Sequence, residues 1–232
     1  MVGVAQLVRA SDCGPEGRGF DPHLPPHITE APFNGVFFIL ERKFKMRVIL
    51  ASASPRRKEL LKKIFDVFEV IPSEVQENYP EKIEAKEIPV YLSDKKATSV
   101  FVENPDALVI ASDTVVVLDD MILGKPSDKN DAFFMLSMLS GKQHKVVTGV
   151  TIIYRNMKIT MNVETVVSFF EMSKREMLEY IETGEPMDKA GAYGIQGYGA
   201  RFVESIIGDY NNVVGLPVSA LYQTLKENGI LR

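Results

Sequence analysis

Residues 47–65 read RVILASASPRRKELLKKIF, and this stretch sets the fold class. The apolar run at its start predicts a short buried strand, and the small residues that follow predict a turn. Pro55 suits the first position of a helix, and Ser54 before it is a good N-cap. Apolar side chains then recur at helical spacing, at Leu60, Leu61, Ile64 and Phe65. Strand, turn and helix in this order are the building block of an α/β domain.

Two arginines, Arg56 and Arg57, open the predicted helix, where the helix dipole already presents positive partial charge. Free N–H groups at a helix N-terminus attract anions, and two guanidinium groups add bidentate contacts to a phosphate. We therefore predict a phosphate site here. The alternative is that both arginines are solvated and pair with Glu59 and other surface acids. The sequence is not a P-loop, because it lacks spaced glycines and the Gly-Lys-Ser/Thr ending.

From Met46 onward, apolar runs alternate with amphipathic segments. Strands are predicted in FEVIPSEV, ALVIASDTVVVL, MIL, KVVTGVTIIY and KITMNVETVVSFF, the last two as an antiparallel pair around Arg155 and Asn156. Helices are predicted after Pro89, from Ser127 or Asp128 to Leu139, over SKREMLEYIETG with a Ser173–Glu176 capping box, and from Val218 to Glu227. Because parallel and antiparallel signals are mixed, we expect an α/β fold with a mixed central sheet flanked by helices.

The composition is that of an ordinary globular protein, with 232 residues of which 45% are hydrophobic and 25% charged. The formal net charge of −4 argues against a general nucleic-acid binder, which needs a basic surface. No apolar run approaches the roughly 20 residues of a membrane span, and the start lacks the pattern of a signal peptide. The single cysteine, Cys13, permits no internal disulfide. We expect a cytoplasmic protein that binds neither nucleic acid nor membrane.

Residues 1–45 differ in composition from the rest of the chain. They hold five of the 13 prolines, five of the 16 glycines, two of the three histidines and the only cysteine. The segment AQLVRA back-translates readily to the D-arm pattern of a transfer RNA gene, and GFDP back-translates to its T-loop. We therefore interpret residues 1–45 as a non-native or disordered extension that resembles a translated tRNA gene, with residues 46–232 as the functional domain. A natural flexible extension is the alternative.

Asp113 lies inside VIASDTVV, which otherwise has the pattern of a buried strand. An ionised carboxylate there is costly unless it is paired, hydrogen-bonded or metal-bound, so Asp113 is a candidate functional residue. The alternative is an aspartate at a strand end that makes local backbone bonds. Lys125 lies in LGKPSD between a predicted strand and a predicted helix, where lone lysines are usually solvated.

The stretch GEPMDKAGAYGIQGYGA, residues 184–200, is rich in glycine and carries Asp188, Lys189, Tyr193 and Gln196. Glycines let the backbone approach a ligand closely, so this stretch predicts a binding loop, with a purely structural loop as the alternative. His144 is a weaker candidate for a catalytic base, because it lies where a turn leads into a strand. The sequence has neither a zinc-binding spacing nor a Gly-x-Ser-x-Gly elbow.

Six segments stand in a fixed order along the chain. They are LASASPRRKELL (50–61), SDTVV (112–116), GKP (124–126), SGKQHKVVTGV (140–150), GEPMDKAGAYGIQGYGA (184–200) and GDYNNVVGLPVSAL (208–221). Each motif is weak alone, but the six together resemble the Maf family of nucleoside triphosphate pyrophosphatases over Met46 to Arg232, 187 of the 232 residues.

This resemblance implies two lobes around a deep cleft, often a homodimer, and a cytoplasmic enzyme that depends on a divalent cation, Mg²⁺ or Mn²⁺. The implied reaction cleaves a nucleoside triphosphate substrate between its α- and β-phosphates. Asp113 matches the family's catalytic acid, as general base toward water or as metal ligand. Glu77 matches the glutamate of a Val-Asp-Glu pattern and is a second implied metal ligand, whereas Gln76 departs from the acid that precedes it. The family's polar and basic cleft positions are matched by Ser52, Arg56, Arg57, Lys96, Lys125 and Lys189.

Substrate choice is also implied only by the resemblance. The members that are similar at SPRR, DT and GIQG are dTTP/UTP pyrophosphatases, in which the residues matching Arg56 or Arg57, Thr114 and Gln196 bear on specificity. A glutamine amide both donates and accepts hydrogen bonds, as the edge of uracil or thymine requires. Two alternatives are a non-catalytic nucleotide-binding regulator of septum formation and cell division, and an enzyme that clears modified nucleotides from the pool.

Overall fold

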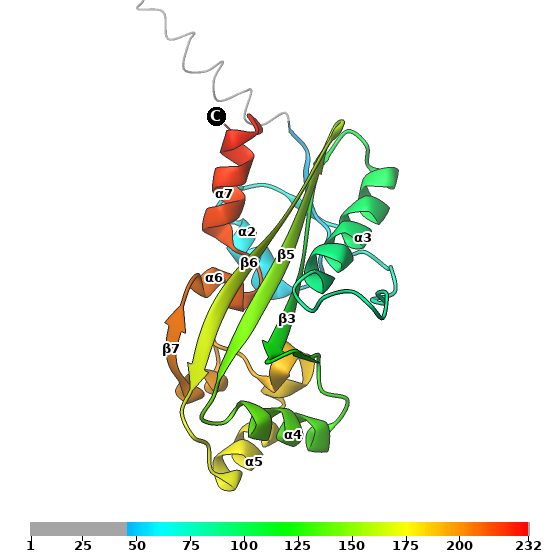
Figure 1. The fold of residues 1–232 in the computed structure, drawn as a ribbon. Coiled ribbons are helices and arrows are strands. Elements are labelled where there is room, and N and C mark those ends of the chain that lie inside the picture. Colours follow the sequence, from blue (N-terminus) through cyan, green and yellow to red (C-terminus); the bar gives the residue numbers. More distant parts are fainter. Residues whose placement is uncertain (1–45, 232) are drawn as a thin grey trace, which may run out of the picture. The chain divides into compact units, whose positions relative to one another are not determined.

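The computed structural model describes residues 46–231, so the interpretation of residues 1–45 lies outside the described chain. A seven-stranded mixed sheet forms the centre (Figure 1), in the order β2-β1-β3-β5-β6-β7 with β4 paired to β3. The strands are β1 (Val48–Leu50), β2 (Glu69–Val70), β3 (Leu108–Leu118), β4 (Met121–Leu123), β5 (Gln143–Tyr154), β6 (Met157–Phe169) and β7 (Val203–Ile207). β1 runs parallel to β2 and β3, and all other pairs are antiparallel. The predicted mixed sheet is confirmed.

Helices flank this sheet. They are α2 (Pro55–Leu61), α3 (Ile88–Glu103), α4 (Lys129–Leu139), α5 (Lys174–Glu182), α6 (Tyr210–Val214) and α7 (Val218–Glu227), with 3₁₀ turns η1 (Glu185–Asp188), η2 (Ala190–Ala192) and η3 (Tyr198–Phe202). The predicted starts of α2 and α4 are confirmed, because Ser54 caps α2 and Asp128 caps α4 through their side chains. α3 begins at Ile88, so Pro89 lies inside its first turn and not before it. Ser173 and Glu176 form the predicted capping box of α5.

Two layers of helix cover the sheet on opposite faces. Val109 and Ala111 of β3 pack with residues of α3, whereas Leu108 and Ile110 pack with residues of α2 and α7. Figure 1 shows α3 and α7 on opposite sides of the long strands. Because side chains alternate along a strand, odd-numbered residues of β3 face α3, whereas even-numbered residues face the opposite side, where Leu108 and Ile110 meet α2 and α7.

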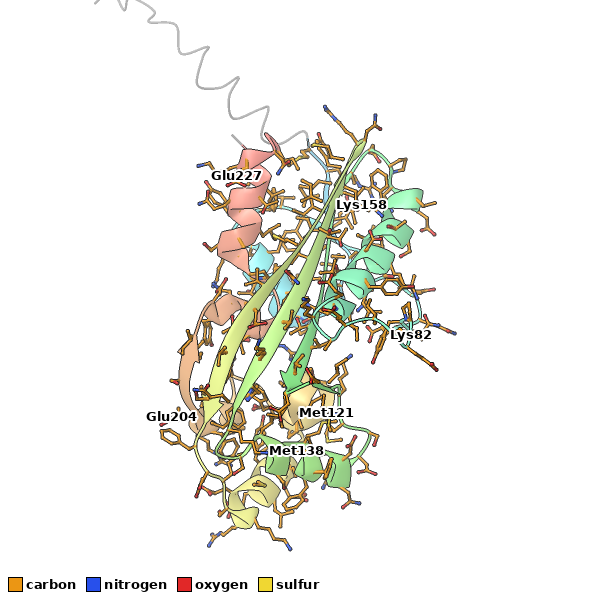
Figure 2. All side chains as sticks on the ribbon, viewed as in Figure 1. Lys82, Met121, Met138, Lys158, Glu204 and Glu227 are labelled. Atoms are coloured by element: carbon orange, nitrogen blue, oxygen red, sulfur yellow. The ribbon has the colours of Figure 1, made fainter. Side chains whose placement is uncertain are left out.

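The long strands span two hydrophobic clusters. One cluster joins α4 and α5 to one end of β3, β5 and β6, through residues such as Leu136, Tyr180 and Phe169. The other joins α2 and α7 to the opposite end, through residues such as Leu61 and Leu221. Met138 of α4 and Lys158 of β6 mark these two ends in Figure 2. The expected two-lobed arrangement therefore rests on strands that are shared by both lobes.

Some predicted elements differ from the observed ones. α2 ends at Leu61, although Phe65 further along the predicted stripe is still buried after a turn. The strand predicted in FEVIPSEV contracts to Glu69–Val70, whose side chains are exposed. β7 and α6 were not predicted, because β7 is a mostly exposed edge strand and α6 has five residues, too short for a periodic pattern. Over residues 46–231, no helix has the length and apolar character that crossing a membrane needs.

Candidate active site

The site lies at a part of β3 where one edge of the strand has no pairing strand. β1 pairs with β3 only as far as Leu50 opposite Ile110, and β4 pairs with β3 only from Val116 onward. The edge of β3 between these two pairings is therefore open at Asp113 and Thr114. Crevices at the carboxyl ends of parallel strands are preferred ligand sites in α/β sheets. The open edge lies just beyond the carboxyl end of β1.

Two carboxylates meet one ammonium group on the α3 face of this edge. Lys96 Nζ of α3 lies 2.5 Å from Asp113 Oδ1 and 2.6 Å from Glu77 Oε1. Asp113 and Lys96 are both buried, with 8% of their surface exposed, whereas the Glu77 side chain is half exposed. The alternative of local backbone bonds for Asp113 is thus wrong, because its carboxylate forms a buried ion pair with Lys96 of α3.

Further cations surround the same carboxylates. The hydrogen bond from Lys96 lowers the pKa of the Glu77 carboxyl, and the charges of Lys125 and Arg57 act in the same direction. Lys125 is exposed in the segment between β4 and α4, so it is solvated, as its sequence position suggested, but close enough to influence Glu77. The α3 face of the open edge therefore collects two acids and several basic groups.

Arg57 lies at the open edge and is held by three partners. Its Nε donates to the carbonyl of Gly215 at 3.0 Å, Nη1 donates to Ser52 Oγ at 3.3 Å, and Nη2 donates to Thr114 Oγ1 at 3.2 Å. Burial lowers the pKa of the Arg57 guanidinium, while the charge of Asp113 opposes this shift. Arginine stays charged in proteins, so a fixed, desolvated cation faces the site. Two of its five N–H donors are not used by these bonds.

Arg56 is bound differently. Its Nη1 forms an ion pair with Asp188 Oδ2 at 3.2 Å, and Lys189 Nζ binds the other oxygen of Asp188 at 2.6 Å. Burial alone raises the pKa of the Asp188 carboxyl, but the hydrogen bonds from Lys189 and Arg56 outweigh it and lower that pKa. Of the surface-pairing alternative, the Glu59 contact is wrong because Glu59 pairs with Lys62, whereas pairing with another exposed acid, Asp188, is found. Arg56 instead links α2 to the segment 184–200, called the glycine loop below.

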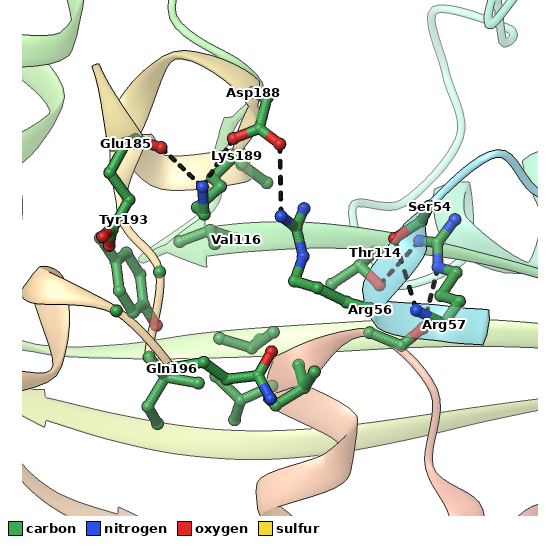
Figure 3. Close-up of a pocket in the computed structure, with 18 residues that line it drawn as sticks. Ser54, Arg56, Arg57, Thr114, Val116, Glu185, Asp188, Lys189, Tyr193 and Gln196 are labelled. Atoms are coloured by element: carbon green, nitrogen blue, oxygen red, sulfur yellow. Dashed lines mark hydrogen bonds and ion pairs between the residues drawn. The ribbon is translucent and has the colours of Figure 1, made fainter. Parts of the chain in front are cut away.

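A cavity of about 330 Å³ lies on the other face of the open edge. Figure 3 shows Arg56 and Arg57 entering it from α2, opposite Asp188 and Lys189, with Thr114 and Gln196 along its wall. Val116, Val146 and Tyr193 add apolar surface. Such a pocket of mixed apolar and charged side chains suits a small organic anion.

The glycine loop is braced by one carboxylate. Glu185 Oε1 accepts from the Tyr180 hydroxyl at 2.8 Å and from the N–H of Gly199 at 3.2 Å, and Oε2 accepts from the N–H of Tyr198 at 2.8 Å. The Tyr180 hydroxyl also accepts from the N–H of Gly194 at 3.0 Å. These bonds tie both ends of the loop together, so Gln196 is presented on a supported backbone.

His144 anchors the same loop from within the core. It is 2% exposed, and its Nε2 lies 2.8 Å from the Tyr193 hydroxyl. Burial lowers the pKa of His144 to about 4, so its ring is neutral at physiological pH. Its Nδ1 has no hydrogen-bond partner among the described residues. The position of His144 in β5, away from Asp113 and packed on Phe169, favours a structural role over that of a catalytic base.

The predicted residues thus form two connected groups. Glu77, Lys96, Asp113 and Lys125 lie on the α3 face, and Ser52, Arg56, Arg57, Thr114, Lys189 and Gln196 lie on the cavity face. Gln196 is exposed and lines the cavity. Sequence reasoning missed Glu185 and Gly215. The available signals were a carboxylate at the start of a glycine-rich loop and a glycine in NVVGLP. Neither signal indicates which residue Glu185 or Gly215 would bind.

The open edge of β3 offers two carboxylates to the divalent cation that the resemblance implies. An ammonium nitrogen lies where the carboxylates of Asp113 and Glu77 converge, so their geometry suits a cation. Within the described residues, no cluster of three or more His, Cys, Asp or Glu side chains forms a complete protein cage. Mg²⁺ is usually held by one or two carboxylates together with substrate phosphates and water. The donor set therefore fits a cation that binds together with a phosphorylated ligand.

The chain is similar to several known proteins. A family model described as Maf-like protein matches residues 47–228. A protein of Carboxydothermus hydrogenoformans named dTTP/UTP pyrophosphatase is 49% identical over 186 residues, which are 79% of this chain and 100% of that protein. A protein of Thermosipho africanus with the same name is 50% identical over 186 residues, 80% of this chain and 95% of that protein. The structure of the Staphylococcus aureus Ham1 protein covers 78% of this chain and 99% of its own, with 15% identity and a TM-score of 0.44.

The segments that face the open edge of β3 all lie inside the matched region. They include the SPRR start of α2, the Asp113-Thr114 pair and the glycine loop. On this match and these identities, the chain belongs to the Maf family.

Proposed function

We propose that this protein hydrolyses dTTP and UTP to the nucleoside monophosphate and pyrophosphate. The observation that carries the proposal is the open edge of β3, where Asp113 faces Lys96 and Glu77 on one side and Thr114 faces Arg57 and a cavity on the other. Relatives at 49% and 50% identity are named dTTP/UTP pyrophosphatase, which supports the substrate assignment.

The charges at the site suit a triphosphate. A nucleoside triphosphate carries three to four negative charges, and Arg57, Lys96 and Lys125 supply positive charge around the open edge. Arg57 is already held by Ser52, Thr114 and Gly215, so binding costs little further loss of its side-chain entropy. Its two unused N–H donors are available to phosphate oxygens.

The hydrolytic step uses water as the nucleophile. A water oxygen forms a bond to the α-phosphorus, the bond from that phosphorus to the oxygen bridging to the β-phosphate breaks, and pyrophosphate leaves with the electron pair. Asp113 either accepts the proton that water loses or binds the cation that orients that water, which are the two roles the carboxylate suits. Lys96 holds the Asp113 carboxylate in place through their ion pair.

A divalent cation, Mg²⁺ or Mn²⁺, would be held by Asp113 and Glu77 together with the phosphates of the substrate. When bound, it neutralises phosphate charge and makes the α-phosphorus more electrophilic. Lys96 would then lose part of its contact with the two carboxylates, because the cation would bind the carboxylate oxygens that Lys96 now contacts.

The cavity provides the remaining contacts. Gln196 and Thr114 would meet the pyrimidine edge, and the apolar surface of Val116, Val146 and Tyr193 would cover its faces. Lys189 and Arg56 are joined through Asp188 at the mouth, so they would close over the ligand from the glycine loop and from α2.

Three expectations complete the proposal: a cytoplasmic location, a homodimer and no binding to nucleic acid. The oligomeric state is measured by light scattering on the purified chain, and a monomer at all concentrations would refute the dimer. Gel-shift titration with duplex DNA at physiological salt tests the third expectation.

The test of the activity is pyrophosphate release by the full chain with Mg²⁺ or Mn²⁺, across dTTP, UTP, CTP, 7-methyl-GTP and ITP. Selective release from dTTP and UTP is expected. If calorimetry detects nucleotide binding but no pyrophosphate is released, the non-catalytic regulator is the better assignment. Preference for ITP or other modified nucleotides would favour the enzyme that clears the nucleotide pool.

A further inference from the structure

A chain of hydroxyl groups runs from the cavity into the sheet. Thr114 of β3 and Thr148 of β5 are direct cross-strand partners, and their Oγ1 atoms lie 2.9 Å apart. Thr148 Oγ1 also lies 3.0 Å from the backbone carbonyl oxygen of Asn212. Thr148 and Asn212 are completely buried, whereas Thr114 is partly exposed to the cavity.

The direction of these hydrogen bonds is determined by simple counting. A threonine hydroxyl has one hydrogen to donate, and a carbonyl oxygen only accepts. The Thr148 hydrogen is therefore committed to Asn212, so Thr148 can only accept from Thr114. Thr114 must then point its own hydrogen into the sheet, away from the cavity.

The other neighbour of Thr114 sets the same direction. Arg57 Nη2 donates to Thr114 Oγ1 at 3.2 Å, and a guanidinium group can only donate. Figure 3 shows Arg57 and Thr114 joined in this way at the cavity wall. One lone pair of Thr114 remains for a ligand, so toward the cavity this hydroxyl is a hydrogen-bond acceptor.

Asn212, at the buried end of this series of hydrogen bonds, is also held in place. The carbonyl of Asn212 also accepts from the N–H of Gly215 at 3.0 Å. Its side-chain Nδ2 donates to the carbonyl of Val146 and to Thr165 Oγ1, both at 3.0 Å. Asn212 therefore cannot rotate to release Thr148 without breaking several buried hydrogen bonds.

We propose that Thr148 is a positioning residue for base selectivity, which keeps Thr114 an acceptor and so favours a pyrimidine that presents an N–H group. This inference rests on the proposed function. Uracil and thymine carry a hydrogen on ring nitrogen N3, whereas cytosine presents a lone pair at the same atom. Two lone pairs that face each other cannot form a hydrogen bond, so cytosine nucleotides are disfavoured. Thr148 acts through Thr114 and does not touch the ligand.

The test compares Thr148→Val with Thr148→Ser in the full chain. Valine keeps the shape of threonine but removes the hydroxyl, so Thr114 becomes free to rotate and to donate toward the cavity. Serine keeps the hydroxyl and its bond to Asn212. The measured quantity is the ratio of kcat/KM for UTP to that for CTP. We expect this ratio to fall by about tenfold or more in Thr148→Val, and to stay within about twofold of wild type in Thr148→Ser.

Two results would overturn the inference. One is a folded Thr148→Val variant whose UTP to CTP ratio equals that of wild type. The other is an equal loss of kcat/KM for UTP and CTP, because Thr114 would then contact a group common to both nucleotides, such as a sugar hydroxyl. If Thr148→Val does not fold, as judged by circular dichroism, Thr148→Ala removes both the hydroxyl and the methyl group, adds no new group to the buried site and gives the same comparison.

Failure of the proposed function would be distinguishable. If the wild-type chain hydrolyses no nucleotide, the hydrolytic assignment is wrong. The selectivity claim is then decided by calorimetric affinities for UMP and CMP, in wild type and in both Thr148 variants, with the same expected change in ratio.

Discussion

Asp113 and Thr114 are consecutive residues of β3, yet their side chains serve opposite faces of the sheet. The Asp113 carboxylate binds Lys96 of α3, while the Thr114 hydroxyl binds Arg57 of α2. Strand alternation produces this division, and the open edge between β1 and β4 lets one ligand reach both faces. The carboxylates and Lys96 therefore lie on one face of the sheet and the cavity lies on the other, although Asp113 and Thr114 are adjacent in the sequence.

Replacing Asp113 with asparagine is expected to lower kcat for UTP by about 100-fold to 10,000-fold, because the amide neither accepts a proton from water nor binds a cation comparably. The fold is expected to persist, since asparagine keeps the volume and Lys96 keeps its bond to Glu77. Pyrophosphate release measures the effect. Asp119→Asn, at the exposed β3–β4 turn, is the matched control. A wild-type kcat in Asp113→Asn would refute both roles proposed for this carboxylate.

The two adjacent arginines are expected to differ. Arg57→Lys should lower kcat/KM by about 100-fold or more, because one ammonium cannot replace three directed bonds to Gly215, Ser52 and Thr114. Arg56→Lys should cost about tenfold or less, since Arg56 makes one ion pair at a partly exposed position. Steady-state kinetics on the two variants gives the comparison, and equal losses would contradict the distinction.

Gln196→Glu is expected to change base preference more than kcat. The carboxylate loses the amide donor, so it cannot donate to a pyrimidine carbonyl, and the preference for UTP over CTP should fall by about tenfold. Gln143→Glu, at the exposed start of β5, adds the same charge away from the cavity and serves as the control. An unchanged substrate profile in Gln196→Glu would count against contact with the base.

Gly149→Ala tests how α3 is seated on the sheet. A Cβ atom at Gly149 would overlap the backbone of Pro89 and Val90, so α3 must shift. Overpacking of this kind costs about 1–3 kcal/mol, which a urea titration detects. Gly124→Ala is the stability control, because nothing lies near its added Cβ. Since α3 carries Lys96, activity should fall together with stability, and a Gly149→Ala variant as stable as wild type would contradict the tight contact.

The stability of the protein should depend on His144 at mildly acidic pH. Burial lowers the pKa of His144 from 6.5 to about 4 in the folded chain, so the unfolded chain takes up a proton first as pH falls. The stabilisation from neutral His144 is therefore complete above about pH 6.5 and is lost as pH falls toward 4. The loss amounts to about 3 kcal/mol. Denaturant unfolding measures the free energy of unfolding between pH 7 and 4. This free energy should fall by the stated amount more in wild type than in His144→Gln. The same pH dependence in both proteins would argue against the role of His144.

The sequence by itself determined the family, most of the element types and most of the helix starts. Capping residues such as Ser54 and Ser173 act within four residues of the chain, so their pattern is visible without the fold. The order of strand and helix signals predicted the mixed α/β fold, the six ordered motifs predicted the family, and both are confirmed. The roles assigned to Asp113, Glu77 and the basic residues stay predictions, although the structure brings them together.

Only the tertiary structure decided which partners the site residues take. Arg56 meets Asp188 across 132 residues of chain, and Arg57 meets the carbonyl of Gly215 across 158 residues. The polarity of the Thr114 hydroxyl depends on Thr148 and on a backbone carbonyl of α6, which no local pattern encodes. Local propensity fixes φ, ψ and side-chain direction over a few residues, whereas the order of strands and the open edge of β3 depend on long-range packing. The chemistry of the site arises at that edge, and so the fold had to be known before it could be described.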